Sequence, residues 1–253
     1  MSVFVLKIIA VIAMLIDHTA AAFGPTIIND MWTGSNIGLF IDPYGLMRSI
    51  GRIAFPIFAY LIAQGCLYTK NIGKYLLRLG VLAIISEPFF DMGFWDGSIN
   101  FLRDTNIFYT LFLGVAAIAL YENLQRNFPK VSNLAILAPL PMMAMAWLLS
   151  TDYSFFGVGI IFLIYLMRPD SHSGRCIALS IGMVTLYGLD AITLTGQINI
   201  NGLSMLAFSL ISVGLIALYN GKLGPSNAAI KWGFYFFYPV HIAVLIAIRA
   251  IAI

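Results

Sequence analysis

The stretch LKIIAVIAMLIDHTAAAF, residues 6 to 23, decides the fold class of this chain. Its apolar run is close to the roughly 20 residues that an α-helix needs to cross the hydrocarbon core of a bilayer. Within the run, Asp17 and His18 stand side by side. An ionisable side chain at this depth costs roughly 3 kcal/mol unless it faces a partner or a cavity. The pair therefore predicts a helix that lines a functional interior.

The composition extends this conclusion to the whole chain. Of the 253 residues, 60% are hydrophobic and only 10% are charged, with a mean hydropathy of +0.92, whereas soluble proteins carry about 25% charged residues. The net charge of +3 is small enough to be a signal of membrane topology, and we expect no nucleic-acid partner. The predicted fold class is an all-α, polytopic membrane protein whose surroundings are the lipid bilayer.

Nine segments have the length and apolar character of a membrane-spanning helix. They are residues 4–23, 46–68, 74–89, 106–121, 133–150, 155–168, 175–194, 202–219 and 232–252. The segments 74–89 and 155–168 are short for a full span. The connections between segments are too short for a soluble domain, so we expect a single membrane domain over residues 1–253.

The positive charges predict the orientation, because Lys and Arg concentrate on the cytoplasmic side of membrane proteins. With the N-terminus inside, the cytoplasmic ends hold all 14 Lys and Arg residues except Arg48, Arg52, Arg103 and Arg249. We therefore expect a cytoplasmic N-terminus and an outer C-terminus.

Lys7 and His18 are the first candidate site residues. They lie three helical turns apart and so share one face, about 16 Å apart along the axis. Histidine suits proton transfer near neutral pH. Asp17 points about 100° away from His18, so its partner should come from another helix, and we expect Arg52 rather than Arg48. The alternative is a buried polar pair with a purely structural role.

Arg48 and Arg52 lie four residues apart in MRSIGRIAFPIF, on one helix face. Pro56 cannot donate to the carbonyl of Arg52, which predicts a kink there. Two guanidiniums beside an unpaired carbonyl could hold an anion or an acyl carbonyl. Arginines at a helix start can also simply reach the membrane interface.

Two further stretches add cations and aromatic residues. In YTKNIGKYLLRLG, Lys74 and Arg78 share a face and could hold phosphates, or follow the positive-inside rule. In KWGFYFFYPVHIAVLIAI, one stripe is predicted to carry Lys231, Tyr235, Tyr238 and then His241. We expect Lys7, Lys74, Arg78 and Lys231 to line the mouth of one central, cytoplasm-facing cavity.

The remaining polar residues give weaker signals. Glu87, Asn106 and Thr110 each fit a helix cap or turn, and His172 in the polar sequence SHSG is expected to be solvated. Cys66 and Cys176 lie in apolar or basic surroundings far apart in the pattern, so neither a disulfide nor a metal site is expected.

The ordered set LKIIAVIAMLIDH, RSIGRIAFPIFAYLIAQG, KYLLRLGVLAIISEPFFD, NIFYTLFLG, DYSFFGVG and YFFYPVHI resembles the TraX family of bacterial membrane proteins. The resemblance follows the same order along nearly the whole chain. The spacing from Lys7 to His18 is also similar to the first-helix motif of the wider acyltransferase-3 group.

The resemblance implies transfer of an acetyl group from cytoplasmic acetyl-CoA, at the bacterial inner membrane, to an acceptor amine or hydroxyl. TraX of conjugative plasmids acetylates the N-terminus of pilin, so a pilin, another small protein or a glycan is the implied acceptor. His18 matches the family histidine and Lys7 the basic residue before it. Arg48 and Arg52 match the arginines of the second block loosely, because the wider group spaces them more closely.

On this reading, His18 and Asp17 form the catalytic pair, with His18 as general base or, alternatively, as acetyl carrier. The residues expected to contact acetyl-CoA are Lys7, Arg48, Arg52, Lys74, Arg78, Lys231, Tyr235, Tyr238 and His241.

Two readings from other functional classes remain open. One is a proton-coupled transporter of a small solute, in which Asp17, His18, Glu87 and His241 relay protons. The sequence has no clear inverted repeat of broken helices, which counts against a transporter. The other is an assembly factor whose charged residues only pack helices, and it leaves His18 unexplained.

Overall fold

The first helix, α1 (Val3–Met31), is broken at the point where the predicted span ends. Gly24 has φ 78° and ψ 169°, outside the helical region, and a positive φ is readily adopted only by glycine. Pro25 follows and lacks the N–H that a continuing helix would need. The first segment therefore ends at residue 23, as the sequence predicted, and a second segment continues to Met31.

The computed structural model describes residues 1–31, 42–95, 97–167, 172–191 and 199–252, without the side chains of 131, 189–191 and 252. Every regular element within these ranges is helical. After α1 they are α2 (Pro43–Gly51), α3 (Ala54–Tyr68), α4 (Ile72–Phe94), α5 (Ile107–Asn127), the 3₁₀-helix η1 (Pro129–Leu137), α6 (Pro139–Leu148), α7 (Ser154–Leu166), α8 (His172–Ala191), α9 (Ile200–Ala217) and α10 (Ala228–Ala252).

The predicted segments correspond to these helices with three differences. The segment 133–150 comprises the end of the 3₁₀-helix η1 and the helix α6. The segment 46–68 is two helices, α2 and α3, and the segment 74–89 is a longer helix that runs through Pro88 to Phe94. Two acidic residues in its C-terminal half, Glu87 and Asp91, are buried. Arg168, used in the orientation argument, and the ends of segments 155–168 and 175–194 lie outside the described residues.

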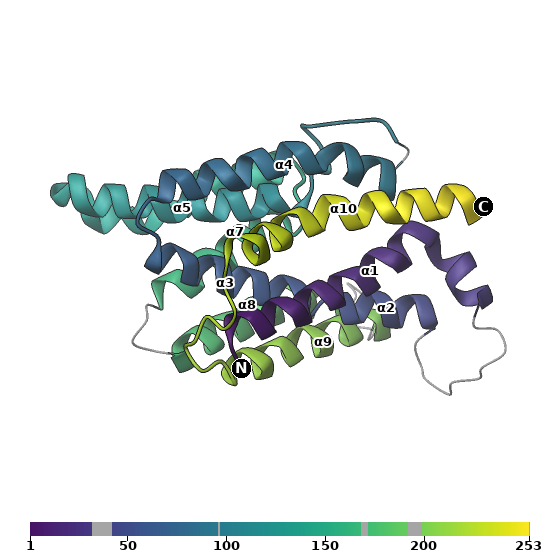
Figure 1. The fold of residues 1–253 in the computed structure, drawn as a ribbon. Coiled ribbons are helices and arrows are strands. Elements are labelled where there is room, and N and C mark those ends of the chain that lie inside the picture. Colours follow the sequence, from purple (N-terminus) through teal and green to yellow (C-terminus); the bar gives the residue numbers. More distant parts are fainter. Residues whose placement is uncertain (32–41, 96, 168–171, 192–198, 253) are drawn as a thin grey trace. The chain divides into compact units, whose positions relative to one another are not determined.

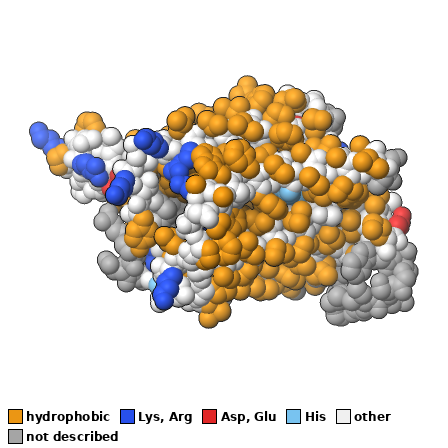
Figure 2. All heavy atoms as spheres, viewed as in Figure 1, with side chains coloured by type: hydrophobic (Ala, Val, Ile, Leu, Met, Phe, Trp, Pro, Cys, Tyr) orange, Lys and Arg blue, Asp and Glu red, His pale blue; other side chains and the backbone are white. Residues whose placement is uncertain are grey.

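Within the described residues, five stretches are long and apolar enough to span a bilayer: Val3–Met31, Pro43–Tyr68, Ile107–Asn127, Ile200–Ala217 and Ala228–Ile251. Large apolar side chains are exposed at helical spacing, for example Val5, Ile8, Ile12 and Leu15 on α1, and hydrophobic side chains cover most of the face seen in Figure 2. Because water would not favour such a surface, the chain is an all-α, multi-pass membrane protein. The nine spans and the cytoplasmic N-terminus stay predictions.

The chain divides into two compact units. Unit 1 contains residues 1–58 and 183–253, and unit 2 contains residues 59–182. In unit 1, α1 packs against both α2 and α10, and α2 also packs against α9 (Figure 1). The hydroxyl of Ser204 on α9 donates to the hydroxyl of Ser49 on α2 at 2.7 Å, with both side chains buried.

The N-terminal residues of unit 1 are held by backbone hydrogen bonds to the connection between α9 and α10. Val3 donates to the carbonyl of Lys222 at 2.9 Å and Phe4 to that of Leu223 at 3.1 Å. Asn220 donates in turn to the carbonyl of Met1 at 2.9 Å. The start of α1 is thereby positioned by a segment more than 200 residues away in the sequence.

Unit 2 is built around α5, which packs against α4, α6 and α7. Asn106 is the N-cap of α5, as the sequence suggested, and its backbone N–H donates to the buried carboxylate of Glu87 on α4 at 3.1 Å. Where α5 meets α7, the two helices approach closely because Gly114 has no side chain. A Cβ added at Gly114 would lie 2.7 Å from Cδ1 of Ile161.

This close approach generates a prediction for Gly114→Ala. Overpacking a tightly packed interior costs about 1–3 kcal/mol, so the free energy of unfolding should fall by that amount. Gly214→Ala on α9 is the matched control, because nothing lies within 4 Å of a Cβ added there. Its stability should be unchanged or rise by up to about 1 kcal/mol. Thermal unfolding of both variants in detergent tests this, and equal effects would contradict it.

Candidate functional site

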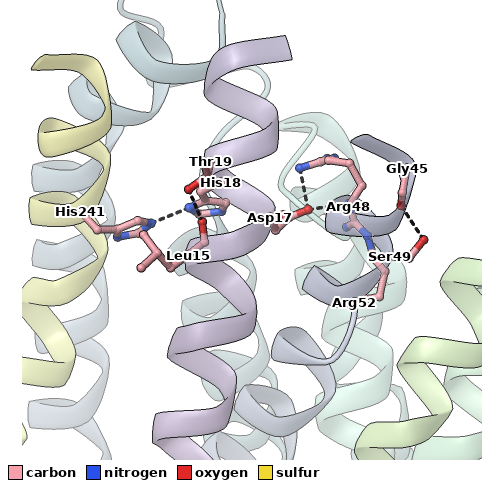
Figure 3. A network of polar contacts seen from close by, with 9 residues as sticks. All are labelled: Leu15, Asp17, His18, Thr19, Gly45, Arg48, Ser49, Arg52 and His241. Atoms are coloured by element: carbon pink, nitrogen blue, oxygen red, sulfur yellow. Dashed lines mark hydrogen bonds and ion pairs between the residues drawn. The ribbon is translucent and has the colours of Figure 1, made fainter. Parts of the chain in front are cut away.

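Helix α1 presents its two adjacent polar residues to two different neighbours. Figure 3 shows Asp17 directed toward Arg48 and Arg52, and His18 directed toward His241 on α10. This divergence follows from the 100° turn per residue of an α-helix, as the sequence analysis expected. All five residues belong to unit 1.

Asp17 forms a buried ion pair. Its Oδ1 lies 2.8 Å from Nη1 of Arg48 and 3.6 Å from Nη2 of Arg52, and the residue as a whole is 9% exposed. The prediction that a cation from the second predicted span meets Asp17 is confirmed. The preference for Arg52 over Arg48 was wrong, because Arg48 is the closer partner. Arg48 lies in the last turn of α2 and can reach across to α1.

The local sequence explains why both arginines can approach Asp17. Helix α2 ends at Gly51 and α3 starts at Ala54, so Arg52 sits at the break, near the position where Pro56 predicted a kink. Gly51 itself contacts Asp17, and a Cβ at Gly51 would overlap the Cβ and Cγ of Asp17. The glycine therefore allows the α2 backbone to approach the carboxylate closely enough for two guanidiniums to surround it.

His18 and His241 form the second polar contact of α1. Nδ1 of His18 lies 2.7 Å from Nε2 of His241, and the two rings are nearly parallel, with centroids 4.9 Å apart and an interplanar angle of 12°. Nδ1 of His241 lies 2.7 Å from the backbone carbonyl oxygen of Phe237. His241 is 6% exposed, and His18 is partly buried.

These contacts determine where the protons of the neutral pair lie. A carbonyl oxygen only accepts, so Nδ1 of His241 must carry the hydrogen that points to Phe237. A neutral imidazole has one N–H, which makes Nε2 of His241 an acceptor. Nδ1 of His18 must then donate to it, and Nε2 of His18 carries the lone pair. The arrangement thus leaves His18 with a basic nitrogen of defined position.

Aromatic rings surround the histidine pair. The buried ring of Tyr238 meets both imidazoles edge-on, with centroid distances of 5.7 Å to His18 and 5.7 Å to His241. One to two turns away on the same helix, Phe234 packs against α1, and its ring centroid lies 5.2 Å from Nζ of Lys7. Lys7 and His18 therefore both face α10, which agrees with their predicted common face.

The other predicted site residues make their printed contacts away from the histidine pair. Lys231 is exposed on α10, near enough for its charge to act on Lys7. Tyr235 packs against Trp232 at a centroid distance of 5.8 Å. Lys74 and Arg78 lie in unit 2, where Arg78 folds back onto its own helix and donates from Nε to the carbonyl of Lys74 at 3.2 Å. The common mouth predicted for all four cations stays a prediction.

Sequence reasoning did not find the direct contact between His18 and His241 or the role of the Phe237 carbonyl. The spacing could have indicated the second contact, because Phe237 precedes His241 by four residues and a histidine in a helix can donate to the carbonyl one turn earlier. His172, which was expected to be solvated, is partly buried, and its Nδ1 lies 3.3 Å from the hydroxyl of the buried Tyr60. Within the described ranges, no group of three His, Cys, Asp or Glu residues could hold a metal ion.

The ion pair predicts the effect of Asp17→Asn. Removing the carboxylate leaves two guanidiniums close together without a counter-charge, and breaking a buried pair in this way costs about 3–5 kcal/mol. Because Arg48 is partly exposed, we expect the loss in the free energy of unfolding to lie near the lower end of this range. The additional change Arg48→Gln should restore part of the stability, because it removes the charge that Asp17 balanced.

The exposed pair Arg103–Asp104, with N to O distance 3.5 Å, gives the matched control. Asp104→Asn should change stability by less than about 0.5 kcal/mol. Thermal unfolding in detergent compares all three variants. A loss for Asp17→Asn no larger than that of the control would show that the pair does not hold α1 to α2.

Comparison with known proteins adds two findings. The chain matches the TraX protein family over residues 2–249. It is also 26% identical to the probable fimbrial assembly protein FimC, serogroup H1, of Dichelobacter nodosus, over 96% of this chain and 94% of that protein. No solved structure matches the chain. Since the family match covers all but the terminal residues, this chain belongs to the TraX family.

Proposed function

We propose that this protein is a membrane-embedded acetyltransferase that moves an acetyl group from acetyl-CoA to an amine or hydroxyl of its acceptor. One observation supports this proposal most directly: His18 is bonded through Nδ1 to His241, so that its Nε2 is the basic atom. A neutral imidazole with a fixed tautomer is the usual general base of acyl transfer. Membership of the TraX family is consistent with this chemistry.

In the proposed reaction, Nε2 of His18 removes a proton from the acceptor nitrogen or oxygen as that atom attacks the thioester carbonyl. The resulting imidazolium keeps its Nδ1–H bond to His241, which stabilises the positive charge. When the carbon–sulfur bond breaks, Nε2 returns the proton to the departing thiolate. The acceptor leaves acetylated, CoA leaves as the thiol, and His18 is neutral again.

In this proposal, other residues of unit 1 bind CoA or hold α1 in position. Lys7 and Lys231 provide two neighbouring positive charges that suit the phosphates of CoA. Phe234 and Tyr238 lie along α10 between these cations and the histidine pair and offer apolar surface to the pantetheine arm. Asp17 contacts arginines and not an imidazole, so it is a positioning residue that holds α1 against α2 through Arg48 and Arg52.

The acceptor we propose is the N-terminal amine of a fimbrial or pilin subunit, with the enzyme in the bacterial inner membrane. Support comes from the relative, whose name describes a probable fimbrial assembly protein. In this proposal, the subunit presents its amine to the active site within the membrane before it is assembled. Cytoplasmic acetyl-CoA then supplies the donor.

The first test is His18→Ala. Loss of a general base lowers the rate about 10²–10⁴-fold, whereas CoA affinity rests on other groups. Release of CoA thiol, with a peptide bearing a free α-amine as acceptor, and acetyl-CoA binding are measured in the same membranes. Full transfer by His18→Ala would favour the transporter, in which the two histidines pass a proton between them.

His241 has a different role in this proposal and is tested with two substitutions. Glutamine at this position retains an acceptor oxygen for the Nδ1–H of His18, whereas leucine does not. His241→Gln should therefore keep more activity than His241→Leu, and both should lower kcat with little change in KM for acetyl-CoA. If the two variants lose activity equally, His241 does not act by fixing the His18 tautomer.

Lys7→Gln and Lys231→Gln test the binding of CoA phosphates. Each should raise KM for acetyl-CoA without lowering kcat, because a phosphate contact is equally strong in the ground state and the transition state. The effect should shrink at high salt. Lys222→Gln, which removes an exposed charge from the same unit, is the control. An unchanged KM in the first two variants would place the phosphates elsewhere.

A further inference from the structure

Unit 2 contains a buried arginine that has no counter-charge among the residues that the structure describes. Arg175, the fourth residue of α8, is 5% exposed. Among the described residues, no carboxylate lies within ion-pair distance of it, and its Nε has no hydrogen-bond partner. Arg175 takes no part in the proposed acetyl transfer, and the sequence assigned it only to the positive charges of the cytoplasmic side.

Neutral groups of α3 hold the guanidinium in place. Nη1 donates to Oε1 of Gln64 at 2.9 Å, and Cζ lies 5.3 Å from the centre of the Tyr60 ring. The hydroxyl of Tyr60 lies 3.3 Å from Nδ1 of His172, the first residue of α8. A guanidinium has five N–H donors, and the contact with Gln64 uses one of them. These contacts with Gln64 and Tyr60 orient the cation without neutralising it.

The position of Arg175 makes its charge costly. A buried charge without a partner is strongly destabilising, more so in a membrane protein, where ionisable groups mark binding sites and ion pathways. The first turn of a helix is also the positive end of its dipole, which disfavours a cation and favours an anion. An anion bound at the start of α8 would offset both effects at once.

We infer that Arg175, held by Gln64 and Tyr60, binds a phosphate group of a ligand. Guanidinium matches phosphate through paired hydrogen bonds, and a phosphate offers more acceptor oxygens than a carboxylate to the donors that Arg175 still has. Two sources carry this chemistry: the headgroup of an anionic phospholipid and the phosphates of CoA. The inference stands independently of the proposed acetyl transfer, since a bound lipid would satisfy it equally well.

The test measures thermal unfolding of the full chain after delipidation into a neutral maltoside detergent. Wild-type protein should gain several degrees in Tm with phosphatidylglycerol, with CoA, or with inorganic phosphate at higher concentration. Diacylglycerol with the same acyl chains, which lacks the phosphate, should give no gain. A response to phosphatidylglycerol alone identifies a lipid site, and a response to CoA identifies a co-substrate site. No response to any phosphate probe overturns the inference.

Arg175→Gln should abolish the gain, whereas Arg126→Gln, which removes an exposed arginine of the same unit, should keep it. Without added phosphate, Arg175→Gln should be at least as stable as the wild type, because it removes a buried charge that nothing balances. A lower Tm under these conditions, or an undiminished response to phosphate, would overturn the inference.

Gln64→Glu provides a second variant that keeps the arginine. It places a carboxylate where Oε1 of Gln64 now lies, 2.9 Å from Nη1, so the chain supplies its own counter-charge. Its Tm in delipidated detergent should rise above that of the wild type, and the response to phosphate should be lost. A Gln64→Glu protein with an unchanged Tm and a full response to phosphate would also overturn the inference.

Discussion

Two adjacent polar residues of α1, Asp17 and His18, make their contacts on two different helices, and the arrangement of unit 1 depends on this. In an apolar environment, each side chain must find a partner within the protein. Asp17 contacts the arginines at the end of α2, and His18 contacts His241 on α10. A rotation of α1 about its axis would break both contacts together. The rotational position of the helix, and with it the face that carries Lys7, is therefore fixed by polar chemistry more than by packing of interchangeable apolar side chains.

The sequence predicted those features that depend on local patterns. The lengths of the apolar runs located the helices. The first span was predicted to end at residue 23, and the helix is broken there by Gly24 and Pro25. The cost of a buried carboxylate predicted a basic partner for Asp17 in the next span. The choice between Arg48 and Arg52 was beyond such reasoning, because it depends on where α2 ends and on how closely Gly51 lets the two helices approach.

Contacts between distant segments could not be predicted in the same way. His18 and His241 are separated by 223 residues, and each was recognised as a candidate from its own surroundings. Nothing in either local pattern indicates that the rings stack or that a carbonyl sets their tautomers. Arg175 was missed for a related reason. Its position near a predicted helix end resembles an arginine at the membrane interface, and only the packing of α8 against Tyr60 and Gln64 reveals that it is buried.

Unit 1 is discontinuous in the sequence, since its first 58 residues join a segment that starts at residue 183. During synthesis, α1 enters the membrane long before its partner α10 exists, so Asp17 can meet the arginines of α2 early while His18 must wait for the end of translation. Unit 2, a continuous stretch, can complete its own packing in the interval. The contact between His18 and His241 is therefore among the last features of unit 1 to form, and a chain that stops before α10 would lack it.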